Sequence, residues 1–420
     1  MTSKLSKIFV VIGTTGAGKT KLSIDLAKAI NGEIVNSDAM QMYRGLDVAT
    51  AKATKEEMEG VPHHLLSCIE PVEDCTVVQY KELALNKIHD IISRGKVPVV
   101  VGGTMYYTQS LLWKAQLLEE VPGTNGETNN IQLPSSPEEV YEKLKQVDPE
   151  MANQLHSKDV RRVQRSLEVF YQTGKKHSEW IAEQKDVSDE KIFNACAFWV
   201  DCDRPTLYER LDKRVDKMVE NGLVSEIDGL MSTIKDHVEA SPTPMGLKGI
   251  TQAIGFKEFE PYLNAKASGN TDLNAVVNSC IEELKIATRQ YAKRQITWIR
   301  NRFVPRNIPV YKFDTSVVSQ WETLVSTPCL EIASAFLKDD PISYTTCQPD
   351  SPGSKKKVKH YCEPCGGREF IGEAQWNEHL RSKGHRFHLK RLRLLASGQL
   401  FERTSKKNKA TDEDPNTTNN

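Results

Sequence analysis

The stretch KIFVVIGTTGAGKT, residues 7–20, decides the fold. Its first half, Lys7–Gly13, is a continuous apolar run, which is typical of a strand buried inside a parallel sheet. Its second half, Gly13–Thr20, fits the pattern G-x-x-x-x-G-K-[ST] in full, and a helical pattern follows from Lys19 to about Ile30. A strand, a glycine loop and a helix in this order predict a P-loop, in which backbone N–H groups at a helix N-terminus bind a phosphate.

The loop defines a candidate diphosphate or phosphate site without establishing ATP hydrolysis. We assign phosphate binding to all eight loop residues: Gly13, Thr14, Thr15, Gly16, Ala17, Gly18, Lys19 and Thr20. Lys19 would add a positive charge, and the Thr20 hydroxyl could hold Mg²⁺. A P-loop NTPase normally adds a strand that ends in an acidic residue. The strand expected at Val97–Val101 ends instead in Gly102-Gly103-Thr104.

An acidic residue expected near the loop is Asp38, which follows the expected strand Glu33–Asn36. A carboxylate at this place could reach a substrate. It could equally cap the next segment, and the spacing does not choose between the two roles.

Strands that alternate with helices predict an α/β fold with a P-loop NTPase-like parallel sheet. To this sheet we add an inserted helical domain and a small C-terminal Cys₂His₂ zinc finger. The expected organisation is a core in two parts (1–117 and 191–339, the second with a long basic helix at 281–303), an insert at 118–190, a linker at 340–357, the finger at 358–395 and a disordered tail at 396–420.

Composition excludes several classes of protein. The chain has 420 residues, of which 39% are hydrophobic and 27% charged, so it can build a core and is not wholly disordered. No window approaches the roughly 18 apolar residues that a membrane span needs. The start, Met1–Lys7, is too short and polar for a signal peptide. Nine cysteines without a disulfide framework indicate a reducing, intracellular compartment.

The C-terminal region combines metal-ligand spacing with positive charge. Cys362-x₂-Cys365-x₁₃-His379-x₅-His385 has the spacing of a structural Zn²⁺ site. Residues 353–410 contain 15 Lys and Arg against 5 Asp and Glu. We therefore predict that the finger binds nucleic acid, with protein binding as the alternative.

Two helices present further arginines. Arg161 and Arg165 lie four residues apart and should project together as phosphate contacts, although a merely solvated face would look the same. Arg210, Arg214 and Lys217 share another helix face. The acids nearby, Asp212, Asp216 and Glu220, favour salt pairing there.

Taken together, these motifs resemble the tRNA dimethylallyltransferase (tRNA isopentenyltransferase) family, most closely its fungal members. The finger is similar to the matrin or U1 type at the C-terminus of eukaryotic members. The motifs that carry the resemblance occur in order along the chain: Gly13–Thr20, Asn36–Tyr43, Gly60–His64, Val101–Tyr107, Asp159–Arg165, Ala253–Glu258 and Thr288–Gln295.

The resemblance implies transfer of a dimethylallyl group from its diphosphate to N6 of adenine 37, beside the tRNA anticodon. It implies Asp38 as general base, Arg214 on the diphosphate, Thr15 near the magnesium or the amine, and Thr104 in the channel where the substrates meet. The implied tRNA contacts are Asp38, Ala39, Met40, Gln41, Thr104, Arg161, Arg162, Val163, Gln164, Arg165 and Lys185.

The expected partners are therefore tRNA and dimethylallyl diphosphate, with Mg²⁺ and a structural Zn²⁺, and no membrane. We expect a monomer in the cytoplasm. The basic run Lys355–Lys359 and the family resemblance leave nuclear and mitochondrial pools open. Two alternatives are a P-loop small-molecule kinase and a non-catalytic RNA-binding protein on a degraded P-loop fold.

Overall fold

The computed structural model describes residues 5–114, 136–187, 189–239, 249–270, 272–349 and 358–397. The chain forms two compact units, one of residues 1–121 and 182–352 and the other of residues 122–181 and 353–420. Residues 115–135 and 398–420, which hold the start of the expected insert and most of the expected tail, lie outside the described residues, as do 350–357 of the expected linker. Within the described part, no helix is both long and apolar enough to cross a membrane.

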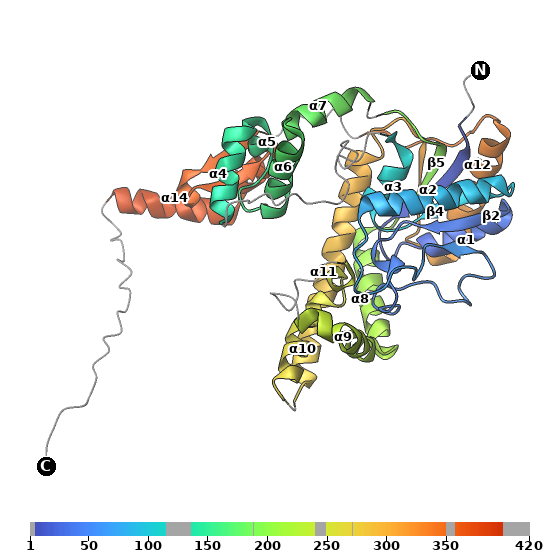
Figure 1. The fold of residues 1–420 in the computed structure, drawn as a ribbon, viewed down its shortest axis with the longest axis horizontal. Helices are drawn as coiled ribbons and strands as arrows, with labels where there is room; N and C mark the ends of the chain where they lie inside the picture. The colour runs from blue at the N-terminus through green and yellow to red at the C-terminus, as the bar shows by residue number, and fades with distance from the viewer. Residues whose placement is uncertain are drawn as a thin grey trace, which may run out of the picture. The chain divides into compact units, whose positions relative to one another are not determined.

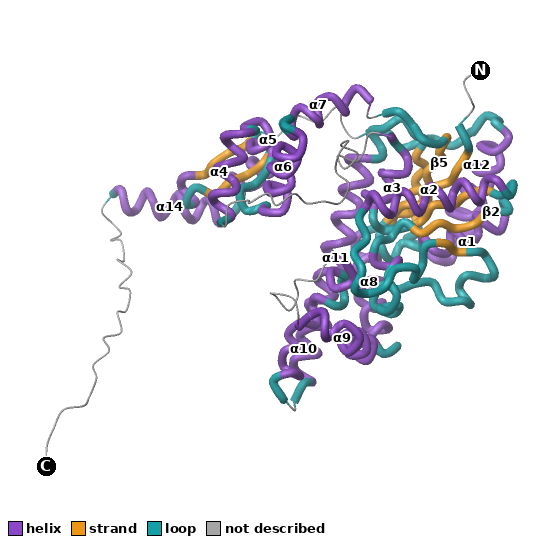
Figure 2. The backbone as a smooth tube through the Cα atoms, in the orientation of Figure 1, coloured by secondary structure: helices purple, strands orange, loops and turns teal. Residues whose placement is uncertain are grey.

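The first unit is built on a parallel sheet, whose described strands follow the order β3–β2–β4–β1–β5–β6. Their bounds are β1 Lys7–Gly13, β2 Gly32–Asn36, β3 His63–His64, β4 Val97–Val101, β5 Asn194–Asp201 and β6 Val310–Asp314. Val11 of β1 pairs with Val101 on one side and with Phe198 on the other. The carboxyl ends of these parallel strands therefore share one edge of the sheet, where ligands usually bind (Figure 2).

Helices cover both faces of the sheet, which explains the continuous apolar run of β1 (Figure 1). Ile8, Val10 and Ile12 share an apolar cluster with residues of α2 (Val77–Ser93), α3 (Met105–Leu112) and α11 (Asn274–Arg302). Phe9 and Val11 face the other cluster, which includes residues of α1 (Lys19–Ala29) and α12 (Thr327–Lys338). The predicted α/β fold with a P-loop-type parallel sheet is confirmed.

Another apolar cluster lies beyond the sheet. It is built from α8 (Arg204–Glu220), α9 (Leu223–Glu239), α10 (Glu260–Ala267) and the first half of α11. The long basic helix begins at Asn274 rather than at 281, because Val276, Val277 and Cys280 pack on this cluster. Helix α11 therefore runs from this helical cluster to the sheet.

The second unit combines the insert with the finger. The insert consists of α4 (Pro137–Val147), α5 (Pro149–Gln154), α6 (Val160–Thr173) and the start of α7 (His177–Val187). The finger consists of the antiparallel strands β7 (Lys359–Cys362) and β8 (Arg368–Ile371), followed by α13 (Glu373–Arg381) and α14 (Lys383–Ala396).

Polar contacts fasten the finger to the insert. The Glu369 carboxylate accepts a hydrogen bond from the Ser157 backbone N–H at 3.1 Å and lies 3.5 Å from the Lys359 ammonium. Lys359 also donates to the Tyr141 hydroxyl and lies over the Tyr141 ring. The Lys359 side chain is only 3% exposed, so these contacts form a closed interface.

A buried carboxylate stabilises the β2 side of the sheet. The Glu33 side chain is 3% exposed and accepts two hydrogen bonds from Arg94, at 2.6 and 2.7 Å. Lys96 and His64 each approach it at 2.7 Å. The Arg94 hydrogen bonds are the main reason that the pKa of Glu33 lies well below its usual range.

We predict that Glu33→Gln lowers the free energy of unfolding at pH 7 by roughly 3 kcal/mol, because it leaves the surrounding cations without their counter-charge. The pKa of Glu33 is lower in the folded than in the unfolded chain. Its contribution is therefore present above the unfolded value of about 4.3 and is lost as the pH falls below it. Urea unfolding between pH 3 and 8 should show the difference from wild type shrinking in acid. The exposed Glu82→Gln on α2 is the control, and a difference independent of pH would contradict the prediction.

Candidate active site and zinc site

A cavity of about 1630 Å³ opens at the carboxyl edge of the sheet. It is lined by residues of the first unit only. They come from the glycine loop (Thr15, Lys19, Thr20), the segment after β2 (Asp38–Gln41), the end of β4 (Gly102–Met105), α8 (Arg214) and α11 (Tyr291, Arg294, Gln295).

The glycine loop needs glycine at defined positions. Gly16 and Gly18 have φ angles of 77° and 93°, in the left-handed region that favours glycine. A Cβ atom on Gly18 would lie 2.8 Å from the Trp321 ring. The loop can therefore form its tight turn before α1, with the helix N-terminus directed at a bound anion.

Lys19 and Arg214 are two of the cationic side chains that line the cavity. Lys19 donates to the Thr14 carbonyl at 2.9 Å, and burial lowers the pKa of Lys19 to about 8. Burial also lowers the pKa of Arg214. Among the described residues, no carboxylate lies within ion-pair distance of either group.

Arg214 does not form the salt bridges that were expected with the acidic residues of α8. Asp212 pairs with Arg289, and Asp216 pairs with Lys285 at 2.8 Å, so α11 engages these acids. Arg214 and Lys19 are thus two positive charges in one cavity, an arrangement that attracts a diphosphate.

Asp38 is held from two sides. One carboxylate oxygen, Oδ1, accepts a hydrogen bond from the Met40 backbone N–H at 3.1 Å. The Asn36 side chain accepts from the Asp38 N–H and donates to the Asp38 carbonyl, both at 3.0 Å. Burial raises the pKa of Asp38, and the nearby charge of Lys19 is the largest opposing influence. Asp38 thus fixes a turn with one oxygen and also lines the cavity, so the capping interaction does not remove it from the cavity.

The two glycines after β4 let this edge close tightly. A Cβ atom on Gly102 would lie 2.2 Å from the Ser37 carbonyl carbon, and one on Gly103 would lie 2.7 Å from Asp38 Oδ2. The Thr104 hydroxyl accepts from the Ala39 N–H at 3.0 Å and so supports the segment that carries Asp38. Glycine stands where an NTPase has an acidic residue because β2 and β4 approach too closely for a side chain.

Tyr291 and Gln295 are not among the residues that the motifs assign to the site. They lie four residues apart on α11, and both donate to the Gly103 carbonyl at 2.9 Å. The signals in the sequence are this spacing on one helix face and the place of both residues in the motif Thr288–Gln295, to which no role was assigned. They could not have shown which element the face packs against.

The expected tRNA-contacting residues fall into two groups. Ala39, Met40 and Gln41 are half-buried at the cavity, and the Gln41 amide donates to the Thr50 carbonyl at 3.0 Å. In the second unit, Arg161 and Arg162 on α6 are exposed.

The other residues of the α6 motif are less available. Arg162 pairs with Asp159 at 2.5 Å, and Arg165, which is half-buried like Gln164, pairs with Glu168 at 3.4 Å. Val163 is 1% exposed and belongs to the core of the insert, so its side chain cannot contact RNA. Lys185 lies in α7, and its side chain is outside the described residues.

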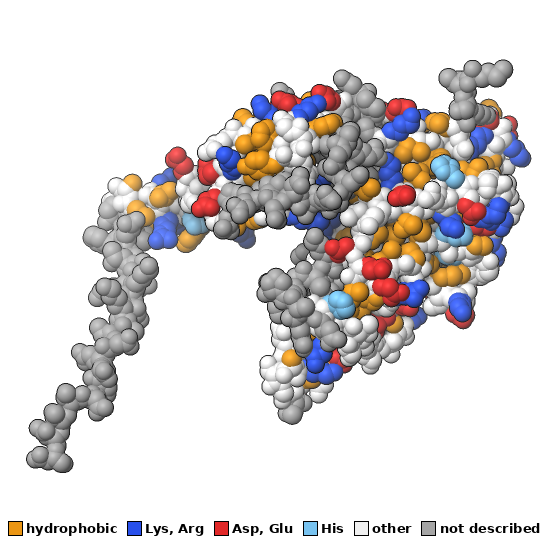
Figure 3. All heavy atoms as spheres, viewed as in Figure 1, with side chains coloured by type: hydrophobic (Ala, Val, Ile, Leu, Met, Phe, Trp, Pro, Cys, Tyr) orange, Lys and Arg blue, Asp and Glu red, His pale blue; other side chains and the backbone are white. Residues whose placement is uncertain are grey.

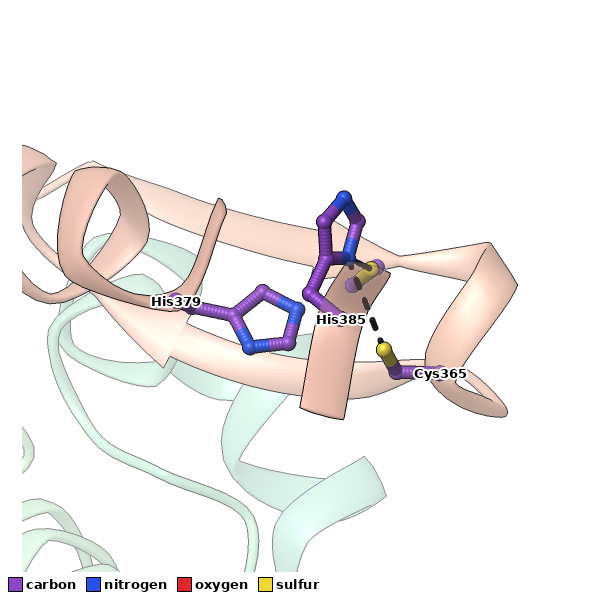
Figure 4. Close-up of side chains that lie close together, drawn as sticks. Cys365, His379 and His385 are labelled. Carbon is purple, nitrogen blue, oxygen red and sulfur yellow. Dashed lines mark hydrogen bonds between the residues drawn. The ribbon is translucent and has the colours of Figure 1, made fainter. Parts of the chain in front are cut away.

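The four expected metal ligands meet in the finger. The ligand atoms of Cys362, Cys365, His379 and His385 all lie within 4.8 Å of one another. Figure 4 shows the two imidazoles converging with Cys365. His385 Nδ1 lies 3.4 Å from one sulfur and 3.6 Å from the other, close to the edge of about 3.5 Å expected for S and N around tetrahedral zinc. His379 Nε2 is buried without a hydrogen-bond partner among the described residues. The donor set therefore fits Zn²⁺.

The fold and the cavity define a class: an α/β P-loop protein in which one cavity is lined by the glycine loop and by a half-buried carboxylate. Within this class, the chain belongs to the IPP transferase family, whose model matches residues 41–302. A second family model, described as a zinc-finger double-stranded RNA-binding module, matches residues 359–386.

Named relatives agree with this assignment. The chain is 38% identical to the human tRNA dimethylallyltransferase, with 93% of this chain and 87% of that protein covered. It is 37% identical to the Saccharomyces cerevisiae tRNA dimethylallyltransferase, with 92% of each covered. A solved structure of a eukaryotic dimethylallyltransferase acting on tRNA superposes with a TM-score of 0.77 at 34% identity, covering 94% of this chain and 99% of that one.

We predict that removing zinc with a chelator unfolds the finger and leaves the α/β core folded, because metal binding supplies most of the folding free energy of such a module. Hydrogen exchange followed by mass spectrometry should show faster exchange over residues 359–396. The exchange rate should also rise at Ser157, whose backbone N–H donates a hydrogen bond to Glu369. Exchange in β1 and β4 should not change. Faster exchange there would contradict the prediction. A Cys362→Ser variant, which removes one zinc ligand, should give the same pattern, and Cys68→Ser, at a cysteine outside the cluster, is its matched control.

Proposed function

We propose that this chain transfers the dimethylallyl group of dimethylallyl diphosphate to N6 of adenine 37 in tRNA and releases diphosphate. The observation that carries this proposal is the cavity at the sheet edge, whose lining contains Lys19, Arg214 and the half-buried Asp38. One side of the cavity suits a leaving diphosphate, and the other suits an amine that must lose a proton. All of these groups come from one chain, so we propose that it acts as a monomer.

The cationic side of the cavity would stabilise the leaving group. Negative charge grows on the diphosphate as the allylic C–O bond breaks, so the Lys19 ammonium and the loop N–H groups bind the transition state more tightly than the ground state. Arg214 would add a second positive charge from α8. Mg²⁺, when bound, would neutralise part of the diphosphate charge, and the exposed Thr20 hydroxyl at the start of α1 is the ligand that the loop offers.

Asp38 would act as the general base. The exocyclic amine of adenine is a weak nucleophile, because its lone pair is delocalised into the ring. A carboxylate fixed beside it can orient the amine and accept its proton as the N–C bond forms. The hydrogen bond from the Met40 N–H to its carboxylate, and the two hydrogen bonds between its backbone and the Asn36 side chain, hold Asp38 in place for this task. Thr104 would hold the segment that carries Asp38 in place, because its hydroxyl accepts a hydrogen bond from the Ala39 N–H. Thr15 would line the path between the two substrates.

RNA recognition would involve both units. The adenine has to leave its stack to enter the cavity, as in other enzymes that modify bases. The exposed Arg161 and the exposed basic side chains of the finger support contacts to the phosphates of the anticodon arm. Figure 3 shows Lys and Arg side chains on the visible face of the finger. The exposed basic residues of α14 are Lys383, Arg386, Lys390, Arg391 and Arg393.

We predict that Asp38→Asn binds dimethylallyl diphosphate as wild type does but transfers it at least about 10²-fold more slowly, the usual contribution of a general base. The assay uses Mg²⁺, labelled donor and an anticodon stem-loop that carries adenine 37. Asp272→Asn, at an exposed aspartate outside the cavity lining, is the matched control. Full activity of Asp38→Asn would remove Asp38 from the mechanism. ATP consumption with a small acceptor, and no transfer to RNA, would favour the kinase alternative.

We also predict that donor binding weakens at alkaline pH. The pKa of Lys19 in the free protein is lowered to about 8, so the ammonium that faces the diphosphate is lost as the pH rises above that value. Titration calorimetry between pH 6 and 10 should show Kd rising above pH 8. Lys19→Arg, which stays charged, should bind with no such rise. A Kd that stays constant to pH 10 in wild type would contradict the assignment.

A further inference from the structure

A single side chain connects the glycine loop to the end of β4. Gln295 of α11 accepts a hydrogen bond from the Thr15 backbone N–H at 2.9 Å through Oε1. Its Nε2 donates to the Gly103 carbonyl, also at 2.9 Å. The two partners require opposite ends of the amide, so only one orientation of Gln295 satisfies both. The side chain is 3% exposed, and a broken hydrogen bond there would leave a buried polar group without a partner.

The Gly103 peptide is held on both sides. Its carbonyl accepts from Gln295 and from the Tyr291 hydroxyl. On the other side, a hydrogen bond from the Gly103 backbone favours the ionised form of Asp38, and a Cβ atom on Gly103 would lie 2.7 Å from both Asp38 Oδ2 and Gln295 Nε2. The contacts therefore run without interruption from Thr15 through Gln295 and Gly103 to Asp38.

These contacts join the two halves of the proposed reaction. Thr15 belongs to the loop that would hold the leaving diphosphate, and Asp38 would hold the attacking amine. Thr15 follows β1 and Asp38 follows β2, and β4 lies between these two strands in the sheet. Helix α11 supplies a rigid support, because its buried residues Ala292 and Ile296 pack in the same apolar cluster as β1 and α3.

We propose that Gln295 is a positioning residue, which fixes the separation between the diphosphate cradle and Asp38. The proposal rests on the function proposed above. Transfer requires the allylic carbon and N6 to approach within about 3–3.5 Å with aligned orbitals, and a misplacement of about 1 Å can cost about 10²-fold in rate. Gln295 has no charge to offer to either substrate, so its contribution should appear in kcat and not in binding.

The test compares three variants in the transfer assay at saturating donor and RNA. Gln295→Met keeps the length and volume of the side chain but removes both hydrogen bonds. We expect its kcat to fall about 10²-fold, while KM for each substrate stays within about threefold. Tyr291→Phe removes only the second donor to Gly103, so its kcat should fall less. Gln290→Met, at an exposed position of the same helix, should match wild type.

A Gln295→Met protein that folds, shown by its unfolding temperature and by donor affinity, and that keeps the wild-type kcat would overturn the proposal. So would a rise in KM with kcat unchanged. If Gln295→Met does not fold, Gln295→Asn decides, because it keeps the polar amide, is one methylene too short to reach both Thr15 and Gly103, and must still lower kcat. Absence of transfer by the wild type would refute the proposed function instead, so the two failures are distinguishable.

Discussion

Close approach across the end of β4 is the constraint on which the cavity depends. β4 lies between β1, which leads into the glycine loop, and β2, which leads into Asp38. After β4, a Cβ atom at position 102 would collide with the Ser37 backbone, and one at position 103 would collide with Asp38 and Gln295. Gly102 and Gly103 avoid these collisions, and the freed space lets the Gly103 peptide touch Asp38 on one side and α11 on the other. The same two glycines account for the absence of a strand-end acid, and thus separate this site from that of an NTPase.

Electrostatics in the cavity follow from burial more than from pairing. Desolvation lowers the pKa of Lys19 and Arg214 and raises that of Asp38. In each case burial destabilises the charged form of the group relative to its neutral form. Arg289 and Lys285 of α11 form salt bridges with Asp212 and Asp216 of α8. Arg214 therefore has no carboxylate within ion-pair distance among the described residues. A diphosphate would relieve the two cations at once. Binding of a diphosphate would therefore offset the cost of placing these two cations in the cavity.

Local patterns in the sequence were sufficient for the parts of the site that one segment builds. The glycine loop and the four zinc ligands could each be predicted from spacing, because each geometry is set by a tight turn or a metal, whereas spacing gave only the place of Asp38 after its strand and the family resemblance implied its role. The start of α11 and the part played by Gln295 could not. Both depend on what the helix packs against, which is set by residues far away in the chain. Arg214 shows the same limit: its neighbours on α8 suggested salt pairs, and only the position of α11 shows where those acids go.

The interface between finger and insert has a consequence for the order in which the chain is made. Ser157 and Glu369 are separated by 212 positions, so at about 5–20 residues per second the ribosome needs roughly 10–40 s between them. During that interval the insert has to persist alone. It can do so because its apolar core, built around Val140, Leu144 and Leu167, is internal, whereas the surface that waits for the finger offers a hydroxyl and an N–H that water can solvate. Because these contacts to the finger are polar, they do not require the nascent insert to expose an aggregation-prone apolar surface during synthesis.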